Sequence, residues 1–165
     1  MQPRPDAATG QDTPAGKLDR TRKGSPLPEL TVSDAMGETL DLASLKGRPT
    51  LVNLWATWCA PCVAELPTLN SIANRADLDL QVVTVSQDMA EPEKVQTFLD
   101  QRGLAQLPAW VDAKGDLPFK LGTATLPVTV LYDSEGREVW RYSGDNDWTS
   151  PEAITLLSEA GATGE

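Results

Sequence analysis

The chain has 165 residues, of which 40% are hydrophobic and 23% charged, a composition that suits one globular domain with a buried core. Lys and Arg number 14 against 24 Asp and Glu, and the resulting net charge of −10 argues against nucleic acid or an anionic membrane surface as a partner. No run of 18 apolar residues is present, and the N-terminus lacks the apolar core of a signal peptide, so we expect a soluble chain.

The first 25 residues are rich in Pro, Gly, Thr and charged side chains and show no hydrophobic periodicity. We predict that residues 1–25 form a disordered tail or tether and that one folded domain covers residues 26–165. Such a tail often joins a domain to something else, so a membrane anchor or signal removed from the chain stays an open alternative.

Ordered structure is expected to begin with a short β-hairpin, in which residues 30–32 and 39–42 flank the turn 34–37. One helical turn at 44–47 follows. Residues 50–55 are rich in β-branched and aromatic side chains and predict a buried strand.

After this strand the hydrophobic pattern alternates between helices and strands. The predicted elements are a helix from 60 to about 75, a strand at 80–86, a helix at 92–102, a short strand at 109–111, a short helix at 116–121, strands at 127–132 and 138–142 and a last helix capped by Ser150. Pro67 should kink the first helix, because proline removes one backbone hydrogen bond. The first half reads as a βαβ unit and the second as an antiparallel hairpin, so we predict an α/β fold whose mixed sheet carries helices on both faces.

Both cysteines of the chain, Cys59 and Cys62, lie two residues apart, directly after the predicted buried strand. Pro61 fits the first turn of the following helix, which places Cys59 at the helix N-terminus, where free N–H groups and the helix dipole favour a thiolate. Cys62, one turn further on, should be the more buried sulfur. Cys59 can therefore attack a partner's disulfide, and Cys62 can resolve the mixed disulfide that results.

A structural disulfide or half of a metal site is the alternative interpretation of this pair. A zinc site needs four ligands, usually Cys and His, and the chain has two Cys and no His. We therefore predict a reactive dithiol with no metal and no other cofactor.

Several segments of the chain resemble a known family. The segment 55–62 (Trp-Ala-Thr-Trp-Cys-Ala-Pro-Cys), the segment 125–129 and the ending of a hairpin plus a helix resemble the thioredoxin superfamily. The N-terminal hairpin, the Glu-Leu-Pro at 65–67 and the extra segment between about 88 and 122 resemble, more narrowly, the TlpA/ResA/CcmG branch of bacterial extracytoplasmic thiol-disulfide oxidoreductases, with TlpA closest. The resemblance covers roughly residues 26–160 and implies a thioredoxin-like fold with an N-terminal β-hairpin and a central insert.

The resemblance assigns roles to individual residues. It implies that Cys59 is the attacking sulfur and Cys62 the resolving one, that Pro127 is a cis-proline facing the disulfide, and that the backbone of Leu126 pairs with an extended substrate segment. Independently, Pro127 begins a strand without donating a ladder hydrogen bond, which fits a strand end beside a site. Trp58 could form an apolar docking surface, with packing as the alternative.

A carboxyl group stands near the cysteines. Glu65 lies three residues after Cys62 on the same side of the helix, so a carboxyl with a raised pKa could take the proton of the resolving thiol; a solvent-exposed glutamate is the alternative. Thioredoxin has a buried aspartate where this chain has Asn53, which cannot carry a proton, and this shifts any base function toward Glu65. Because no His lies between the cysteines, we predict a reductant whose Cys59 pKa is moderately lowered.

The function favoured by these residues is reduction of disulfides in specific extracytoplasmic proteins, such as apocytochromes c or copper-oxidase assembly proteins. A membrane thiol carrier would supply the electrons, and the resemblance implies a location in the periplasm or on the outer face of the bacterial membrane. A copper(I) chaperone is one alternative, since thiolates suit Cu(I), although the absence of His and the scarcity of Met weigh against it. A thiol peroxidase is another, but it needs an Arg near the reactive cysteine, and none follows closely.

Overall fold

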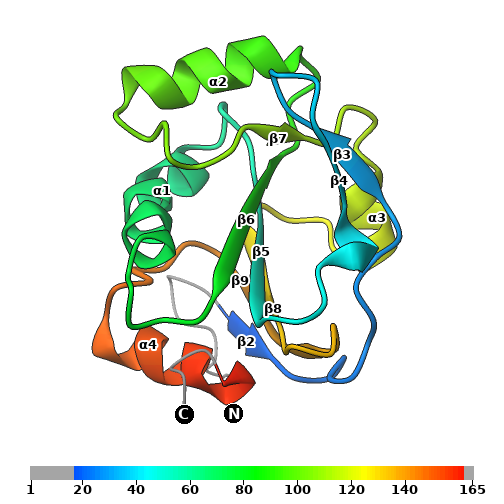
Figure 1. Ribbon diagram of the computed structural model, residues 1–165, viewed down its shortest axis with the longest axis vertical. Helices are drawn as coiled ribbons and strands as arrows, with labels where there is room; N and C mark the ends of the chain where they lie inside the picture. Colours follow the sequence, from blue (N-terminus) through cyan, green and yellow to red (C-terminus); the bar gives the residue numbers. More distant parts are fainter. Residues whose placement is uncertain (1–16, 162–165) are drawn as a thin grey trace, which may run out of the picture.

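A computed structural model of the chain describes residues 17–161, which form one eight-stranded sheet with helices packed against it (Figure 1). The strands follow the order β2-β9-β8-β5-β6-β7-β3-β4 across the sheet. The strands are β2 (Lys17–Asp19), β3 (Thr31–Ser33), β4 (Thr39–Asp41), β5 (Thr50–Trp55), β6 (Gln81–Ser86), β7 (Trp110–Val111), β8 (Val128–Tyr132) and β9 (Glu138–Ser143). The helices are α1 (Ala60–Ala73), α2 (Pro92–Gln101), α3 (Asp116–Leu121) and α4 (Pro151–Leu157), with 3₁₀ turns at Leu42–Ser44 and Ser158–Ala160.

Strand β5 is the centre of the sheet, and all six of its residues are buried. It runs parallel to β6, to which α1 connects it, and antiparallel to β8, which continues into β9. Apolar residues on both faces of a strand are typical of this central position. The predicted βαβ unit, the antiparallel second half and the mixed sheet are confirmed.

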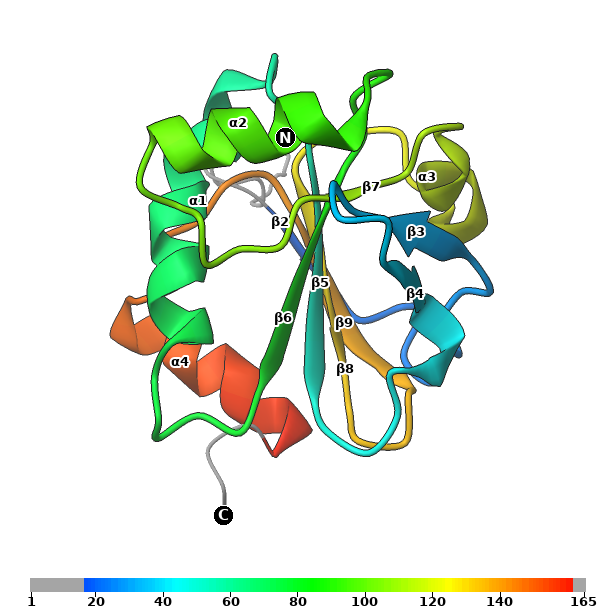
Figure 2. The same ribbon diagram turned by 45° about the horizontal axis from the view of Figure 1, so that its top comes forward.

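Helices cover both faces of the sheet and bury two apolar clusters (Figure 2). Helices α1, α2 and α4 pack on one face, through residues such as Leu69, Leu99 and Leu157. Helix α3 and the β3–β4 hairpin cover the other face, where Leu117 and Val32 join the second cluster. The predicted fold class is confirmed, and the segment between Asp88 and Gly122 supplies α2, β7 and α3.

The ordered domain begins earlier than predicted. Residues 17–19 form β2, which pairs antiparallel with β9 and places Leu18 opposite Tyr142. The Arg20 guanidinium then binds the Glu159 carboxylate at 2.6 Å. The prediction of a disordered tail is therefore wrong for residues 17–25, while residues 1–16 lie outside the described residues. A three-residue strand is too short to show hydrophobic periodicity. Its order comes from pairing with β9.

Three local predictions concern the helices. Helix α1 continues through Pro67 to Ala73 as a single element, and the proline side chain is exposed. The Ser150 hydroxyl accepts a hydrogen bond from the Ala153 N–H at 3.1 Å, which confirms the predicted cap of α4. The helical turn expected at 44–47 instead occupies Leu42–Ser44, where the Asp41 carboxylate accepts from the Ala43 N–H.

Candidate active site

Cys59 and Cys62 form a disulfide at the start of α1, with their Cα atoms 5.3 Å apart. Cys59 is the N-cap of the helix, and its Sγ accepts a hydrogen bond from the Cys62 N–H at 3.3 Å. The Cys59 side chain is 8% exposed and that of Cys62 is fully buried. Cys62 is thus the more buried sulfur of the pair, as the sequence predicted.

The helix N-terminus also sets the electrostatic environment of the Cys59 sulfur. Pro61 lies in the first turn of α1, where its missing N–H costs no hydrogen bond. The Cys62 N–H is already directed at the Cys59 sulfur. When the disulfide is reduced, this donor and the positive end of the helix dipole favour a thiolate at Cys59.

The Leu126–Pro127 peptide bond is cis, as the resemblance implied. In the β5–β8 pairing Leu54 lies opposite Val128, so the next pair beyond it, Trp55 and Pro127, lies at the edge of the sheet from which the cysteine loop emerges. The Pro127 carbonyl accepts a hydrogen bond from the Gly144 N–H at 2.8 Å. The sheet register therefore brings the start of β8 to the cysteine end of β5.

Glu65 is buried, with only 2% of its surface exposed, so the alternative of a solvent-exposed glutamate is wrong. Its Oε2 accepts a hydrogen bond from Asn53 Nδ2 at 2.9 Å. Its Oε1 accepts from the indole Nε1 of Trp148 at 2.9 Å and from the Asn146 N–H at 3.2 Å. The carboxylate therefore ties α1 to the central strand and to the loop between β9 and α4.

Opposing effects set the protonation of this carboxyl. Burial raises the pKa of Glu65 from an ordinary value of 4.5 to about 7, while the donors Trp148, Asn53 and Asn146 act in the opposite direction. Near neutral pH the group is therefore divided between its acid and its carboxylate forms. Asn53 also donates to the Thr129 hydroxyl at 3.0 Å, and its own Oδ1 has no partner among the described residues.

Sequence reasoning missed two partners of Glu65. Neither Trp148 nor Asn146 was singled out from the sequence as a site residue. A buried indole N–H needs an acceptor, but its acceptor lies 83 residues away in the chain, so no local sequence signal could have identified the pair.

Asp88 was missed as well, although it holds the loop that carries the cysteines. Its carboxylate accepts hydrogen bonds from the Thr57 N–H at 3.0 Å, from the Thr57 hydroxyl at 2.6 Å and from the Ser86 hydroxyl at 2.6 Å. Trp58, the residue after Thr57 in this loop, is 70% exposed, whereas Trp55, the last residue of β5, is buried. A signal existed: Asp88 follows β6, and parallel neighbours β5 and β6 end at the same edge of the sheet.

No group of three or more potential metal ligands of the His, Cys, Asp and Glu types occurs among residues 17–161. Within the same residues, no helix has the length and hydrophobicity needed to cross a bilayer.

A cysteine pair at a helix N-terminus, at the edge of the sheet where a cis-proline strand begins, defines a redox protein of the thioredoxin fold. The model of the Redoxin family matches residues 22–157, and the chain belongs to this family. It is a thiol-disulfide oxidoreductase with Cys59 and Cys62 as its cysteine pair.

Individual relatives agree with this assignment. The chain is 31% identical over 131 residues to the thiol:disulfide interchange protein DsbE of Vibrio cholerae, covering 78% of this chain and 69% of that one. It is 28% identical over 123 residues to the thiol-disulfide oxidoreductase ResA of Bacillus thuringiensis, covering 74% and 70%. A crystal structure from Chlorobium tepidum, described as a thiol:disulfide interchange protein DsbE, superposes with a TM-score of 0.73 at 25% identity and covers 84% of this chain and 96% of that one.

The raised pKa of Glu65 predicts how stability depends on pH. Below pH 4.5 the folded and unfolded chains both hold the proton, whereas between pH 4.5 and about 7 only the folded chain does. Raising the pH through this range therefore removes stability, by roughly 3 kcal/mol, at about 1.4 kcal/mol per pKa unit. Urea unfolding of the oxidised protein at a series of pH values should show this loss relative to Glu65→Gln, whose amide does not titrate.

Glu152→Gln, at an exposed position in α4, is the matched control and should follow the wild type. If wild type and Glu65→Gln lose stability in parallel between pH 4.5 and 7.5, Glu65 does not have the raised pKa.

The Asp88 contacts predict a measurable coupling with Thr57. In a double-mutant cycle of Thr57→Val and Asp88→Ala, urea unfolding should give a coupling free energy of about 1–2 kcal/mol, because the buried carboxylate loses a charge-assisted hydrogen bond. The exposed pair Arg48 and Asp79, 3.0 Å apart, is the control and should give about 0.5 kcal/mol or less. Equal coupling in the two cycles would contradict the role of Asp88.

Proposed function

We propose that this oxidoreductase acts as a reductant of specific extracytoplasmic protein disulfides, with Cys59 as the attacking sulfur and Cys62 as the resolving one. The observation that carries the proposal is the asymmetry of the pair, since Cys59 is reachable at the helix N-terminus and Cys62 is fully buried. A sulfur that solvent cannot reach is suited to an intramolecular step.

The proposed reaction runs through one mixed disulfide. The Cys59 thiolate attacks one sulfur of the substrate disulfide, and the other substrate sulfur leaves as a thiolate and takes up a proton. Cys62 then loses its proton and attacks the Cys59 sulfur, which releases the second substrate thiol. The substrate gains two electrons and two protons, and the protein is left with the Cys59–Cys62 disulfide.

Glu65 is the proposed acceptor of the Cys62 proton. A general base works best when its pKa lies near the working pH, and burial raises the pKa of Glu65 to about 7. Glu65 lies one helical turn beyond Cys62, both side chains are buried, and no other acid in the described residues combines these properties. Asn53, which hydrogen-bonds this carboxyl, orients it without accepting a proton itself.

The proposed substrate surface consists of Trp58, Leu126 and Pro127. Trp58 offers an exposed aromatic ring next to the attacking sulfur, and large aromatic residues are favoured anchors in interfaces. Leu126 is half-buried and lies two residues before Val128, the first residue of β8, and this position beside a strand end supports backbone pairing with an extended substrate segment.

The substrates and electron donor are proposed from the resemblance of the sequence to the TlpA/ResA/CcmG branch. We expect disulfides of apocytochromes c or of copper-oxidase assembly proteins as substrates, and a membrane thiol carrier as the donor. We therefore also propose a location in the periplasm or on the outer face of the bacterial membrane. A reducing direction is supported by the cysteine loop, where Ala60 and Pro61 lie between the cysteines and no His stabilises the thiolate further.

A trapping variant tests this function. Cys62→Ser should accumulate mixed disulfides between Cys59 and its substrates, because the resolving step is lost. Non-reducing electrophoresis of extracts, followed by mass spectrometry of the adducts, measures this, and Cys59→Ser is the control that should trap nothing. Copper binding or peroxide consumption by the wild type, with no adducts in Cys62→Ser, would favour a copper chaperone or a thiol peroxidase instead.

The proton transfer has its own test in the reduced protein. The rates at which iodoacetamide alkylates Cys59 and Cys62 should depend on pH near 7 in the wild type, because ionisation of Glu65 changes the charge beside the sulfurs. Glu65→Gln should remove that inflection, whereas Glu152→Gln should retain it. An unchanged profile in Glu65→Gln would remove the proposed role.

A further inference from the structure

A second polar region lies at the opposite end of β5 from the cysteines. There Thr50, the first residue of β5, pairs with Tyr132, the last residue of β8. Beside Tyr132 is a cavity of about 550 Å³, bounded by the segment 22–29, the C-terminal end of α3 and the start of β9. We call it the basic cavity, and it shares no residue with the redox site.

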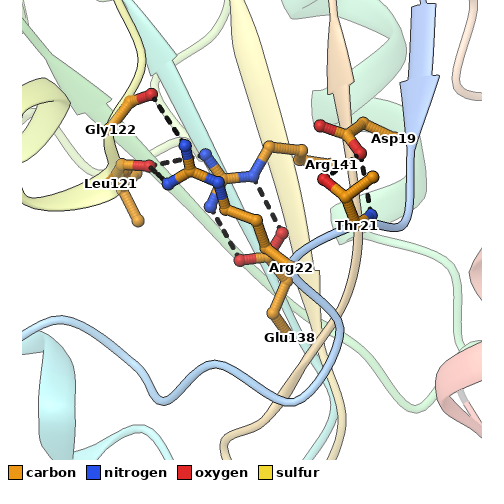
Figure 3. A network of polar contacts seen from close by, with 7 residues as sticks. All are labelled: Asp19, Thr21, Arg22, Leu121, Gly122, Glu138 and Arg141. Carbon is orange, nitrogen blue, oxygen red and sulfur yellow. Dashed lines mark hydrogen bonds and ion pairs between the residues drawn. The ribbon is translucent and has the colours of Figure 1, made fainter.

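Two guanidinium groups converge at this cavity (Figure 3). Arg141 donates from Nε and Nη2 to the two carboxylate oxygens of Glu138, each at 2.8 Å, and from Nη1 to the Leu121 carbonyl at 2.6 Å. Arg22 donates from Nη1 to that same carbonyl at 2.9 Å. Glu138 neutralises Arg141, but Arg22 has no carboxylate partner within residues 17–161. Asp19 also acts on Arg141 electrostatically, so of these two guanidinium groups Arg22 is the one that forms no ion pair with a described residue.

Two lysines add to that charge. Lys46 and Lys120 also line the cavity, both are exposed, and neither forms an ion pair with a described residue. Four basic side chains thus face two acidic ones, Glu138 and Glu29, in a chain whose net charge is −10. A positive concave region on an acidic protein attracts small anions.

The buried hydroxyl of Tyr132 is a second feature of the basic cavity, separate from its charges, that indicates a ligand. The Tyr132 side chain forms part of the cavity wall and is 1% exposed, and its hydroxyl has no hydrogen-bond partner among the described residues. Burial and the nearby Glu138 raise the pKa of Tyr132, so the hydroxyl remains protonated and is a buried donor without an acceptor. Capping of the last carbonyls of α3 explains the arginine contacts, but it explains neither this hydroxyl nor the unpaired lysines.

We propose that the basic cavity binds a small organic anion, whose carboxylate or phosphate group is held by Arg22, Lys46 and Lys120 and accepts a hydrogen bond from the Tyr132 hydroxyl. The walls suit the rest of such a molecule, because Leu27, Pro26 and Pro28 provide apolar surface next to the charges. The site is independent of the disulfide chemistry.

The test uses the full-length oxidised protein labelled with ¹⁵N, titrated with phenyl phosphate and with benzoate, and with phenol as the neutral control. We expect saturable amide shifts within residues 22–29, 120–122 and 132–138 for an anion and none for phenol. The anion that binds more tightly distinguishes a phosphate from a carboxylate ligand. Equal binding of phenol, or shifts spread over the whole surface without saturation, would overturn the proposal.

Three variants sharpen the result. Lys46→Gln with Lys120→Gln should raise the dissociation constant by about tenfold or more, because charge-assisted hydrogen bonds are lost. Tyr132→Phe removes only the unpartnered hydroxyl, so it should weaken binding while leaving the unfolding midpoint unchanged or higher. Lys114→Gln, at an exposed position outside the cavity, should bind like the wild type. Wild-type affinity in both cavity variants would show that these groups do not form a site.

Discussion

The buried Glu65 carboxyl is the interaction on which the site depends. It joins α1 to the central strand through Asn53 and to the β9–α4 loop through Trp148 and Asn146. A buried carboxylate is costly unless donors surround it, and here three N–H groups do so. The same burial brings its pKa close to neutrality, so the group that fixes the helix carrying the cysteines is also able to exchange a proton.

The environment of the sulfurs follows from where the central strand ends. Strand β5 is buried on both faces and delivers the chain to the edge of the sheet, where Cys59 caps α1. Asp88, at the end of the parallel neighbour β6, holds the intervening loop through Thr57. Helix α1 therefore fixes Cys59 on one side, and the hydrogen bonds between Asp88 and Thr57 fix the preceding loop on the other. Trp58, between Thr57 and Cys59, is exposed.

The molecule separates its two polar centres along the central strands. At the cysteine end of β5 the Glu65 carboxyl has only neutral hydrogen-bond donors as partners and no ion pair among the described residues, which leaves it able to titrate. At the other end Glu138 is paired with Arg141 through two hydrogen bonds, and the buried charge is matched. A paired charge stabilises a fixed arrangement, whereas an unpaired one responds to pH. This contrast separates a carboxyl group that can titrate from a charge pair that is fixed.

The sequence alone determined the elements with long hydrophobic patterns, the central βαβ unit and the reactive pair, because strand periodicity, Pro61 and the two-residue spacing are local signals. Burial of Cys62 followed from helix geometry, and cis Pro127 from resemblance. Tertiary structure decided that residues 17–19 pair with β9, that Glu65 is buried, and that Asp88 and Trp148 serve the site. Leu18 lies opposite Tyr142, Trp148 binds Glu65 across 83 residues and Asp88 binds Thr57 across 31, and such contacts depend on how the sheet brings distant segments together.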